Sequence, residues 1–334
     1  MLKVDAINLK VVAEKLPIET RKGTQGHLTN IYIVDGEKIE VSNINAYLLD
    51  APDVIVEDRH DPISQVPKMS VGSFPTDGGN LVIQEECLEE FIRKDPLAKK
   101  FVRMYLGPVE FIKGKKRYCL WLKDCTPAEL KAMPCVRERV LKVREYRLSS
   151  KKEQTKKRAD IPTLFAEDRQ PDSDYILVPR TSSENRRYLP MGFLSKDVIA
   201  GDTIILPDAT IYHFGILTSN VHMAWMRTVT GRLKSDYRYS NTIVYNNFPW
   251  PDVTEQQKAK IEQTAKAILA ARENNSGLSL ADLYDEAFMP ADLRKAHKAN
   301  DRAVMEAYGM WGKVHSEAEC VAWLFRLYQE LTEK

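Results

Sequence analysis

The stretch Phe214-Gly-Ile-Leu-Thr-Ser-Asn-Val-His-Met-Ala-Trp-Met-Arg-Thr-Val229 carries the clearest structural signal in this chain of 334 residues. Apolar side chains recur in it at helical spacing, at Leu217, Val221, Trp225 and Val229. Residues four apart lie on one face of an α-helix, so the pattern predicts a buried helix. Arg227 falls outside the apolar stripe, and we expect it to emerge from the helix surface.

The period changes in the next segment, Gly231-Arg-Leu-Lys-Ser-Asp-Tyr-Arg-Tyr-Ser240. If this segment is extended, successive side chains point to opposite faces. One face then holds Lys234, Asp236, Arg238 and Ser240, and the other holds Leu233, Tyr237 and Tyr239. The sequence therefore predicts a strand with one wholly polar face.

Lys234 and Asp236 suit a G·C base pair. In the major groove a lysine can donate to guanine O6 and N7, and an aspartate can accept from cytosine N4. The spacing alone leaves a second interpretation open, in which the two side chains form an ordinary solvated ion pair.

The formal net charge of +2 hides a segregation of charge along the chain. Residues 1–100 carry 12 basic and 17 acidic side chains, residues 101–250 carry 26 and 16, and residues 251–334 carry 11 and 14. Phosphate binding needs a local positive field, because salt limits the reach of a charge to about 10 Å. The middle of the chain is therefore the candidate interface with nucleic acid.

Two basic segments of this middle region are candidates for phosphate contacts. Arg137–Arg158 holds ten basic and three acidic residues, and its end, from Ser149 on, has no apolar anchor, so we expect that end to order only on a polyanion. A solvated helix face is the alternative. In the segment 179–190, hydroxyls alternate with guanidinium groups, which are common phosphate donors, although Ser182 and Ser183 could instead cap a turn. The candidates are Lys151, Lys152, Lys156, Lys157, Arg158, Arg180, Ser182, Ser183, Arg186 and Arg187.

Short alternating runs predict several strands. Residues 7–12 and 30–34, with a turn signal at Asp35-Gly36, predict strands and a hairpin. A loop rich in Pro, Asp and Gly then extends to Asn80. Further strands are expected at residues 109–112, 117–122, 175–179 and 203–207.

Helical spacing predicts two short helices between residues 84 and 106, split by Pro96, and a longer one at 126–147. Beyond Pro251 the chain is expected to be helical, at residues 254–273, 280–288, 291–308 and 316–331. Thr254 with Gln257, and Ser316 with Glu319, fit capping boxes. The fold class is thus a mixed α/β (α+β) domain with a C-terminal α-helical domain.

The motifs of several enzyme classes are absent from the sequence. It has no Gly-rich phosphate loop, no His-Glu-x-x-His, no Gly-x-Ser-x-Gly, no S-adenosylmethionine loop and no Asn/Asp-Pro-Pro-aromatic tetrapeptide. The five cysteines show no paired spacing, which indicates reduced thiols and no zinc site. We therefore expect no catalytic residue, metal or cofactor in this chain.

No run of residues approaches the roughly 20 apolar residues of a membrane span, and the charged start of the chain lacks the apolar core of a signal peptide. We expect a cytoplasmic protein without a membrane partner.

Some segments carry a specific resemblance, above all Gly231–Ser240 and Tyr245-Asn-Asn-Phe-Pro-Trp-Pro251, and in addition Asn45–Pro52, Arg117–Leu122, Ser182–Glu184 and Phe214–Leu217. Together they resemble the target-recognition region of MmeI-like type IIG/IIL restriction-modification enzymes, and segments beyond Leu280 resemble the helical tail of that family. The resemblance implies a DNA target-recognition domain at residues 51–251 and a helical domain at 252–334. Residues 1–50 are then the remnant of the end of a methyltransferase domain.

Enzymes of this family join a nuclease, a helical spacer, an adenine-N6 methyltransferase that uses S-adenosylmethionine, and a recognition domain. Because the catalytic motifs are absent, we interpret the chain as a fragment whose partners are double-stranded DNA and the methyltransferase domain. The alternative is a separately encoded specificity subunit that docks on a methyltransferase through its helical tail. An enzyme with a site invisible in the sequence and a protein-interaction module also stay open.

The resemblance also implies roles for single residues. Lys234 and Asp236 match positions that select one base pair, where Lys-x-Asp implies G and Glu-x-Arg implies C. Arg238 is implied as a further base-selecting residue. We place Arg227, Arg232 and Ser240 at or near the DNA backbone, and we assign Tyr245–Pro251 to fixing the turn into the final helices.

Overall fold

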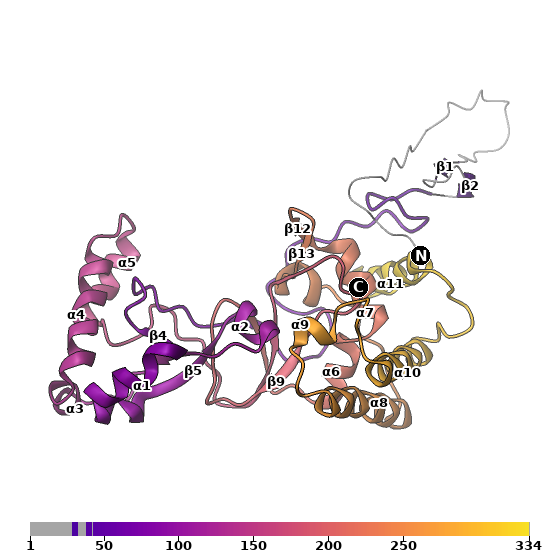
Figure 1. Cartoon of the computed structure of the whole chain (residues 1–334). Helices are drawn as coiled ribbons and strands as arrows, with labels where there is room; N and C mark the ends of the chain where they lie inside the picture. The colour runs from indigo at the N-terminus through magenta and orange to yellow at the C-terminus, as the bar shows by residue number, and fades with distance from the viewer. Residues whose placement is uncertain (1–28, 33–37, 42, 334) are drawn as a thin grey trace.

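Two lobes, each built around its own hydrophobic core, make up the computed structural model, which describes residues 29–32, 38–41 and 43–333 (Figure 1). A small apolar cluster that includes Tyr175 and Ala200 lies apart from the two main cores. The predicted strand at residues 7–12 and the Asp35-Gly36 turn lie outside the described residues.

The smaller lobe contains a four-stranded sheet in the order β10-β5-β6-β4. Its outer pair β10·β5 is parallel, and the other pairs are antiparallel. The strands are β4 (Val82–Gln84), β5 (Val102–Leu106), β6 (Arg117–Leu120) and β10 (Ile199–Ala200). The helical elements of this part are α1 (Glu85–Lys94), η1 (Pro96–Phe101), α2 (Pro108–Lys113), α3 (Pro127–Lys131), α4 (Pro134–Leu148), α5 (Glu153–Lys157) and η2 (Arg158–Asp160).

The larger lobe combines an antiparallel sheet, in the order β3-β11-β7-β9, with the C-terminal helices. Its strands are β3 (Ser70–Val71), β7 (Tyr175–Val178), β9 (Gly192–Leu194) and β11 (Ile204–Pro207). Its helices are α6 (Ile211–Leu217), α7 (Asn220–Val229), η3 (Asn241–Tyr245), α8 (Glu255–Asn274), α9 (Leu280–Leu283), α10 (Ala291–Ala307) and α11 (Glu317–Thr332).

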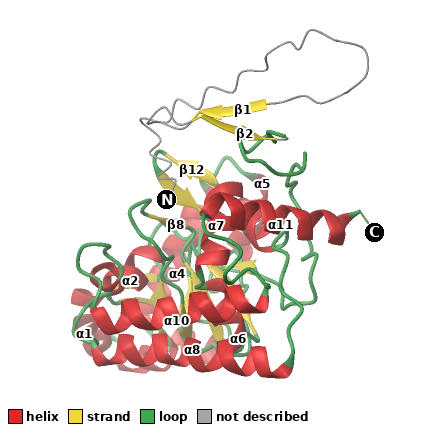
Figure 2. Cartoon of the chain, turned by 90° about the vertical axis from the view of Figure 1, so that its right-hand side faces the viewer, coloured by secondary structure: helices red, strands yellow, loops and turns green. Residues whose placement is uncertain are grey.

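A third sheet is formed by β8 (Thr181–Ser182), β12 (Gly231–Leu233) and β13 (Asp236–Arg238). Figures 1 and 2 both place it on the side of the larger lobe opposite α8. A separate antiparallel pair joins β1 (Thr29–Tyr32) to β2 (Lys38–Val41).

These elements confirm the mixed α/β fold class with a C-terminal helical region. Helix α8 begins at the predicted cap, where the Thr254 hydroxyl accepts from the Gln257 N–H and the Gln257 side chain accepts in return from the Thr254 N–H. At the start of helix α11 one of the two capping-box hydrogen bonds is present, because the Ser316 hydroxyl accepts from the Glu319 N–H. The Glu319 carboxylate accepts from the His315 N–H rather than from the Ser316 N–H. In the part of the chain that the structure describes, no helix is long and apolar enough to cross a membrane.

The predicted strand at 109–112 is wrong, because these residues form helix α2. Pro108 occupies the first helical position, where its missing N–H costs nothing, and the Glu110 carboxylate accepts from the Gly107 N–H at 2.9 Å. Gly114 ends the helix with a φ of +63°. Start and stop signals therefore outweigh the β-branched composition of this short segment.

Four predicted helices are shorter or divided. Pro134 disfavours helical backbone at Met133, so the helix expected at 126–147 becomes α3 and α4. The helix expected at 214–229 breaks where the Ser219 hydroxyl accepts from the His222 N–H and caps α7. After Pro96 a 3₁₀ turn leads into strand β5, and the helix expected at 280–288 stops at Leu283.

The basic segment after Ser149 forms helix α5 and the turn η2, and a buried arginine anchors it. Arg147 is fully buried, and its guanidinium donates to five main-chain carbonyls. Those acceptors are Pro75, Thr76, Arg158, Ile161 and Leu164, at 2.7 to 3.1 Å. One side chain thus ties the segment around α5 and η2 to the loop at 75–76.

We predict that Arg147→Met lowers the free energy of unfolding by about 3 kcal/mol or more, because a buried carbonyl left without a donor costs roughly 1–3 kcal/mol. Urea unfolding measures this loss. Arg144→Met, on the exposed side of the same helix, should stay within about 0.5 kcal/mol of the parent chain. Equal stabilities of the two variants would contradict the role of Arg147.

Candidate nucleic-acid interface

Strands β12 and β13 form a tight hairpin whose loop consists of Lys234 and Ser235. The cross-strand partners are Gly231 with Arg238, Arg232 with Tyr237, and Leu233 with Asp236. Strand β8 adds to the other side of β13, where Ser182 pairs with Tyr237 and Thr181 with Arg238. The structure therefore brings together two segments that the sequence singled out separately.

The hairpin loop contains a strained lysine. Lys234 has a φ of +58°, in the left-handed region that a residue with a Cβ enters at a cost of roughly 1–2 kcal/mol. Two-residue hairpin loops normally use Gly or Asn at such a position. The backbone at the hairpin tip is therefore strained, as it also is at Leu48, Thr76 and Asp208.

The loop also corrects the prediction of a single extended strand. In a hairpin, directly opposite residues share a face, so the two-residue loop moves Leu233 to the face of Asp236 and Arg238. The opposite face holds Arg232 and the buried Tyr237. The exposed face is thus polar with one apolar member, and Lys234 lies at the tip rather than on a strand.

The base of the hairpin is held by a buried hydrogen bond. Tyr239 is 2% exposed, and its hydroxyl lies 3.0 Å from Nε2 of the fully buried His222 on α7. Its N–H continues the sheet by donating to the Arg180 carbonyl at 2.8 Å. Burial lowers the pKa of His222 to about 3, so the pair stays neutral near neutral pH.

The segment Tyr245–Pro251 has a structural role, as expected, although it does more than turn the chain into the final helices. The Asn246 amide donates to the carbonyls of Arg59 and His60, and the Asn247 amide donates to that of Glu57. The Tyr245 hydroxyl donates to the Pro67 carbonyl at 2.6 Å. These contacts fix the irregular chain at 57–67 against η3, immediately after the hairpin.

The model of "MmeI, target recognition domain" matches residues 50–252, and the model of "MmeI, C-terminal domain" matches residues 253–334. The chain belongs to the MmeI target recognition domain family. It is 38% identical to "DNA methyltransferase A" of Bacillus subtilis (strain 168), over 99% of this chain and 37% of that protein.

Among solved structures, it is similar to the Type IIL restriction-modification enzyme MmeI in complex with DNA. The TM-score is 0.85 at 43% identity, over 94% of this chain and 42% of that one. This chain therefore spans well under half the length of either relative.

In this member of the MmeI family, the three residues predicted to read bases lie together on the hairpin. Lys234 and Arg238 are exposed, and within residues 43–333 neither side chain has an ion pair. Asp236 is half-buried. Burial lowers the pKa of Arg186, and the negative charge of Asp236 partly opposes this shift. The hairpin thus presents two free cations and one carboxylate.

Several predicted phosphate contacts have intramolecular partners instead. Arg227 does not emerge as expected, because its guanidinium binds the Glu317 carboxylate through two 2.8 Å hydrogen bonds. Arg232 lies 4.5 Å above the Tyr237 ring and donates to the Ser235 carbonyl, and Arg180 pairs with Asp202 at 2.9 Å. Arg232 thus braces the hairpin itself, whereas Arg227 ties α7 to α11 and Arg180 binds Asp202 in the turn before β11.

The predicted hydroxyl contacts are also partly occupied. Ser240 caps η3 by accepting from the Ile243 N–H, and the Ser183 hydroxyl accepts from the Asn185 N–H. Ser182 is buried, and its hydroxyl has no hydrogen-bond partner among the described residues. Arg187 is exposed and lies 5.7 Å from the Tyr188 ring centre.

A pocket of about 290 Å³ opens beside the hairpin. It is lined by Arg180, Ile204, Gly231, Arg238, Tyr239, Ser240 and Asn241. Gly231 has no atom within 4 Å of the position that a Cβ would take, so this side of the hairpin is open. The Arg238 guanidinium at this opening suits an anionic ligand, whereas that of Arg180 is paired with Asp202.

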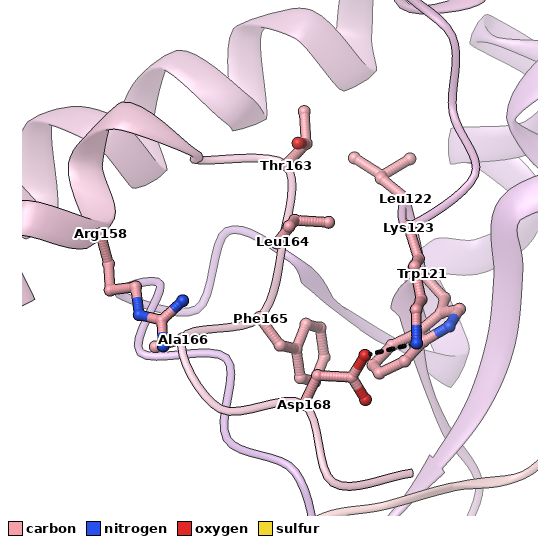
Figure 3. Close-up of a pocket in the computed structure, with 9 residues that line it drawn as sticks. All are labelled: Trp121, Leu122, Lys123, Arg158, Thr163, Leu164, Phe165, Ala166 and Asp168. Atoms are coloured by element: carbon pink, nitrogen blue, oxygen red, sulfur yellow. Dashed lines mark ion pairs between the residues drawn. The ribbon is translucent and has the colours of Figure 1, made fainter. Parts of the chain in front are cut away.

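The basic residues in and around α5 lie far from the hairpin, in the other lobe (Figure 1). Lys156 pairs there with Glu153, while Lys151, Lys152, Lys157 and Arg158 are exposed. Figure 3 shows Arg158 at the edge of a second pocket, opposite the Lys123–Asp168 ion pair. The structure therefore separates the predicted phosphate contacts into two groups, one on each lobe.

His222 makes the stability of the hairpin base depend on pH. An unfolded histidine titrates near pH 6.5, and the pKa of His222 in the fold is about 3, so unfolding between these values takes up a proton at His222. Its contribution to stability is complete above about pH 6.5 and is lost as the pH falls towards 3.

We predict that His222→Gln reduces the slope of unfolding free energy against pH near pH 5 by up to about 1.4 kcal/mol per pH unit, which corresponds to one proton. Urea unfolding over a pH series measures the slope. Phe248→Leu, which loosens the ring packed 4.6 Å from His222 but removes no titratable group, should lower stability and keep the slope. An unchanged slope in His222→Gln would disprove that the lowered pKa of His222 makes stability depend on pH.

Proposed function

We propose that this chain recognises a specific sequence of double-stranded DNA, with the β12–β13 hairpin as the element that reads base edges. The observation that carries this proposal is the exposed face and tip of the hairpin, where Lys234, Asp236 and Arg238 project from a rigidly buried base. A two-stranded ribbon fits the major groove, which is about 12 Å wide.

Hydrogen-bond chemistry supports a G·C pair as the target of the tip. The Lys234 ammonium donates to guanine O6 or N7, and the Asp236 carboxylate accepts from cytosine N4. Both side chains reach the same region of the groove, because Asp236 is the first residue of β13 after the loop. Arg238, two residues further on the same face, is proposed as a further base-selecting residue.

Phosphate contacts on both lobes orient the hairpin in this proposal. Arg186, Arg187 and Ser183 flank it on the larger lobe, and the exposed Lys151, Lys152, Lys157 and Arg158 extend from the smaller lobe. Each neutralised phosphate releases counterions and makes binding salt-dependent. Arg232 braces the hairpin, while the guanidinium groups of Arg180 and Arg227 are engaged by Asp202 and Glu317.

We further propose that the chain works with an adenine-N6 methyltransferase domain of a restriction-modification protein. The support is family membership and the greater length of both relatives. S-adenosylmethionine, the methyl donor of such domains, is then bound by the methyltransferase domain. The guanidinium group of Arg238 at the pocket beside the hairpin suits a phosphate rather than a positively charged sulfonium.

A charge swap at the tip tests base reading. We predict that Lys234→Glu combined with Asp236→Arg changes one preferred base pair from G·C to C·G when the chain selects from a randomised duplex library. The expected discrimination is roughly 5- to 150-fold, because a good base contact contributes about 1–3 kcal/mol. Lys266→Glu, on α8 at the opposite side of the lobe, should keep the parental preference. An unchanged preference in the double swap argues against base reading.

Salt dependence tests the basic group on the smaller lobe. We predict that Lys151→Ala combined with Lys152→Ala weakens binding to all duplexes alike and reduces the slope of log K against log salt by about 2. Titrations of the chain with duplex DNA at several salt concentrations give this slope. A slope equal to that of the parent chain would exclude these lysines as phosphate contacts.

A further inference from the structure

Leu233 is an exposed apolar residue at the end of β12, directly before the tip of the hairpin. Its side chain is 54% exposed, and it belongs to none of the hydrophobic clusters formed by the described residues. Single exposed leucines are common and need no explanation by themselves. What distinguishes Leu233 is its register, because it is the direct cross-strand partner of Asp236.

The register fixes where the Leu233 side chain points. Directly opposite residues of an antiparallel pair project to the same face, with Cβ atoms about 4.5–5.5 Å apart. Leu233 therefore stands beside Asp236 on the exposed face, next to Lys234 at the tip. The left-handed backbone of Lys234 and the Arg232 contact to the Ser235 carbonyl define the loop between them.

This position matches the chemistry of pyrimidines in the major groove. The cytosine N4 that Asp236 is proposed to contact lies on the same edge as the C5 position of pyrimidines, and thymine carries a methyl group at C5. Successive base pairs are stacked about 3.4 Å apart. A leucine about 5 Å from Asp236 can thus reach the neighbouring base step while Asp236 contacts cytosine.

We propose that Leu233 is a further specificity-determining residue, which contacts the C5-methyl group of a thymine in the base pair adjacent to the G·C pair read by Lys234 and Asp236. The proposal rests on the proposed function of the hairpin. It predicts that the sequence selected by the chain contains a T·A pair beside that G·C pair. Covering the methyl group removes two apolar surfaces from water, which explains an exposed leucine on a polar face.

The test replaces each thymine of the selected duplex in turn with deoxyuridine, which lacks only the methyl group. The parent chain should bind one of these duplexes, at the thymine adjacent to the G·C pair, roughly three- to tenfold more weakly. Leu233→Ala should bind the thymine and uracil duplexes equally and retain the preference for G·C. Leu278→Ala removes another exposed leucine, outside the hairpin, and should behave like the parent chain.

Two results would overturn the role of Leu233: a parent chain that is insensitive to uracil at that pair, or a Leu233→Ala variant that keeps the full loss. A further duplex carries 5-methylcytosine in place of the cytosine of the G·C pair. If only this duplex is bound more weakly, the role of Leu233 is also overturned, because the leucine would then contact the cytosine itself. The absence of any selected sequence would instead overturn the proposed function of the hairpin. Thermal melting of Leu233→Ala, expected at the parental temperature, confirms that the variant is folded.

Discussion

The neutral hydrogen bond between Tyr239 and His222 fixes the base of a hairpin whose tip and one face are exposed. A ribbon that projects only a two-residue loop can place Lys234 accurately only if the strands below it cannot move. Burial keeps both partners uncharged, so the anchor involves no ion pair that salt or a nearby phosphate could weaken. The rigid base and the charged tip are thus separate parts of one short segment.

Buried side-chain hydrogen bonds also hold the chain in place where it has no regular secondary structure. Arg147 donates to five carbonyls around the basic segment of the smaller lobe, and Asn246 and Asn247 donate to carbonyls of the chain at 57–60. Side-chain donors replace the main-chain partners that a helix or sheet would supply. Irregular segments next to both groups of basic residues are thereby held in defined positions.

Periodicity and caps predicted most of the framework, because both are local. The mixed fold class and the C-terminal helices follow from apolar spacing and from caps such as Thr254. Contacts between distant residues were not accessible in this way. Arg147 was counted only as one charge of a basic run, whereas the structure uses it as a buried donor. The expected strand at 109–112 failed because Pro108 and Gly114 define a helix.

The sequence singled out the residues of the candidate site, but it did not predict their arrangement on a hairpin. Alternation along an extended chain placed Leu233 with the buried tyrosines, and the loop at Lys234 reversed that assignment. Two-residue hairpin loops are recognised in a sequence by Gly or Asn at the position with positive φ. Because this position is occupied by Lys234, the sequence contained no signal for the turn.

The most direct measurement is a chemical double-mutant cycle at the tip, with 7-deazaguanine in place of the guanine and Lys234→Ala in place of the parent chain. If Lys234 donates to N7, the parent chain loses about tenfold in affinity on the altered duplex and Lys234→Ala loses nothing further. Equal losses in both proteins would contradict the reading of guanine N7 by Lys234.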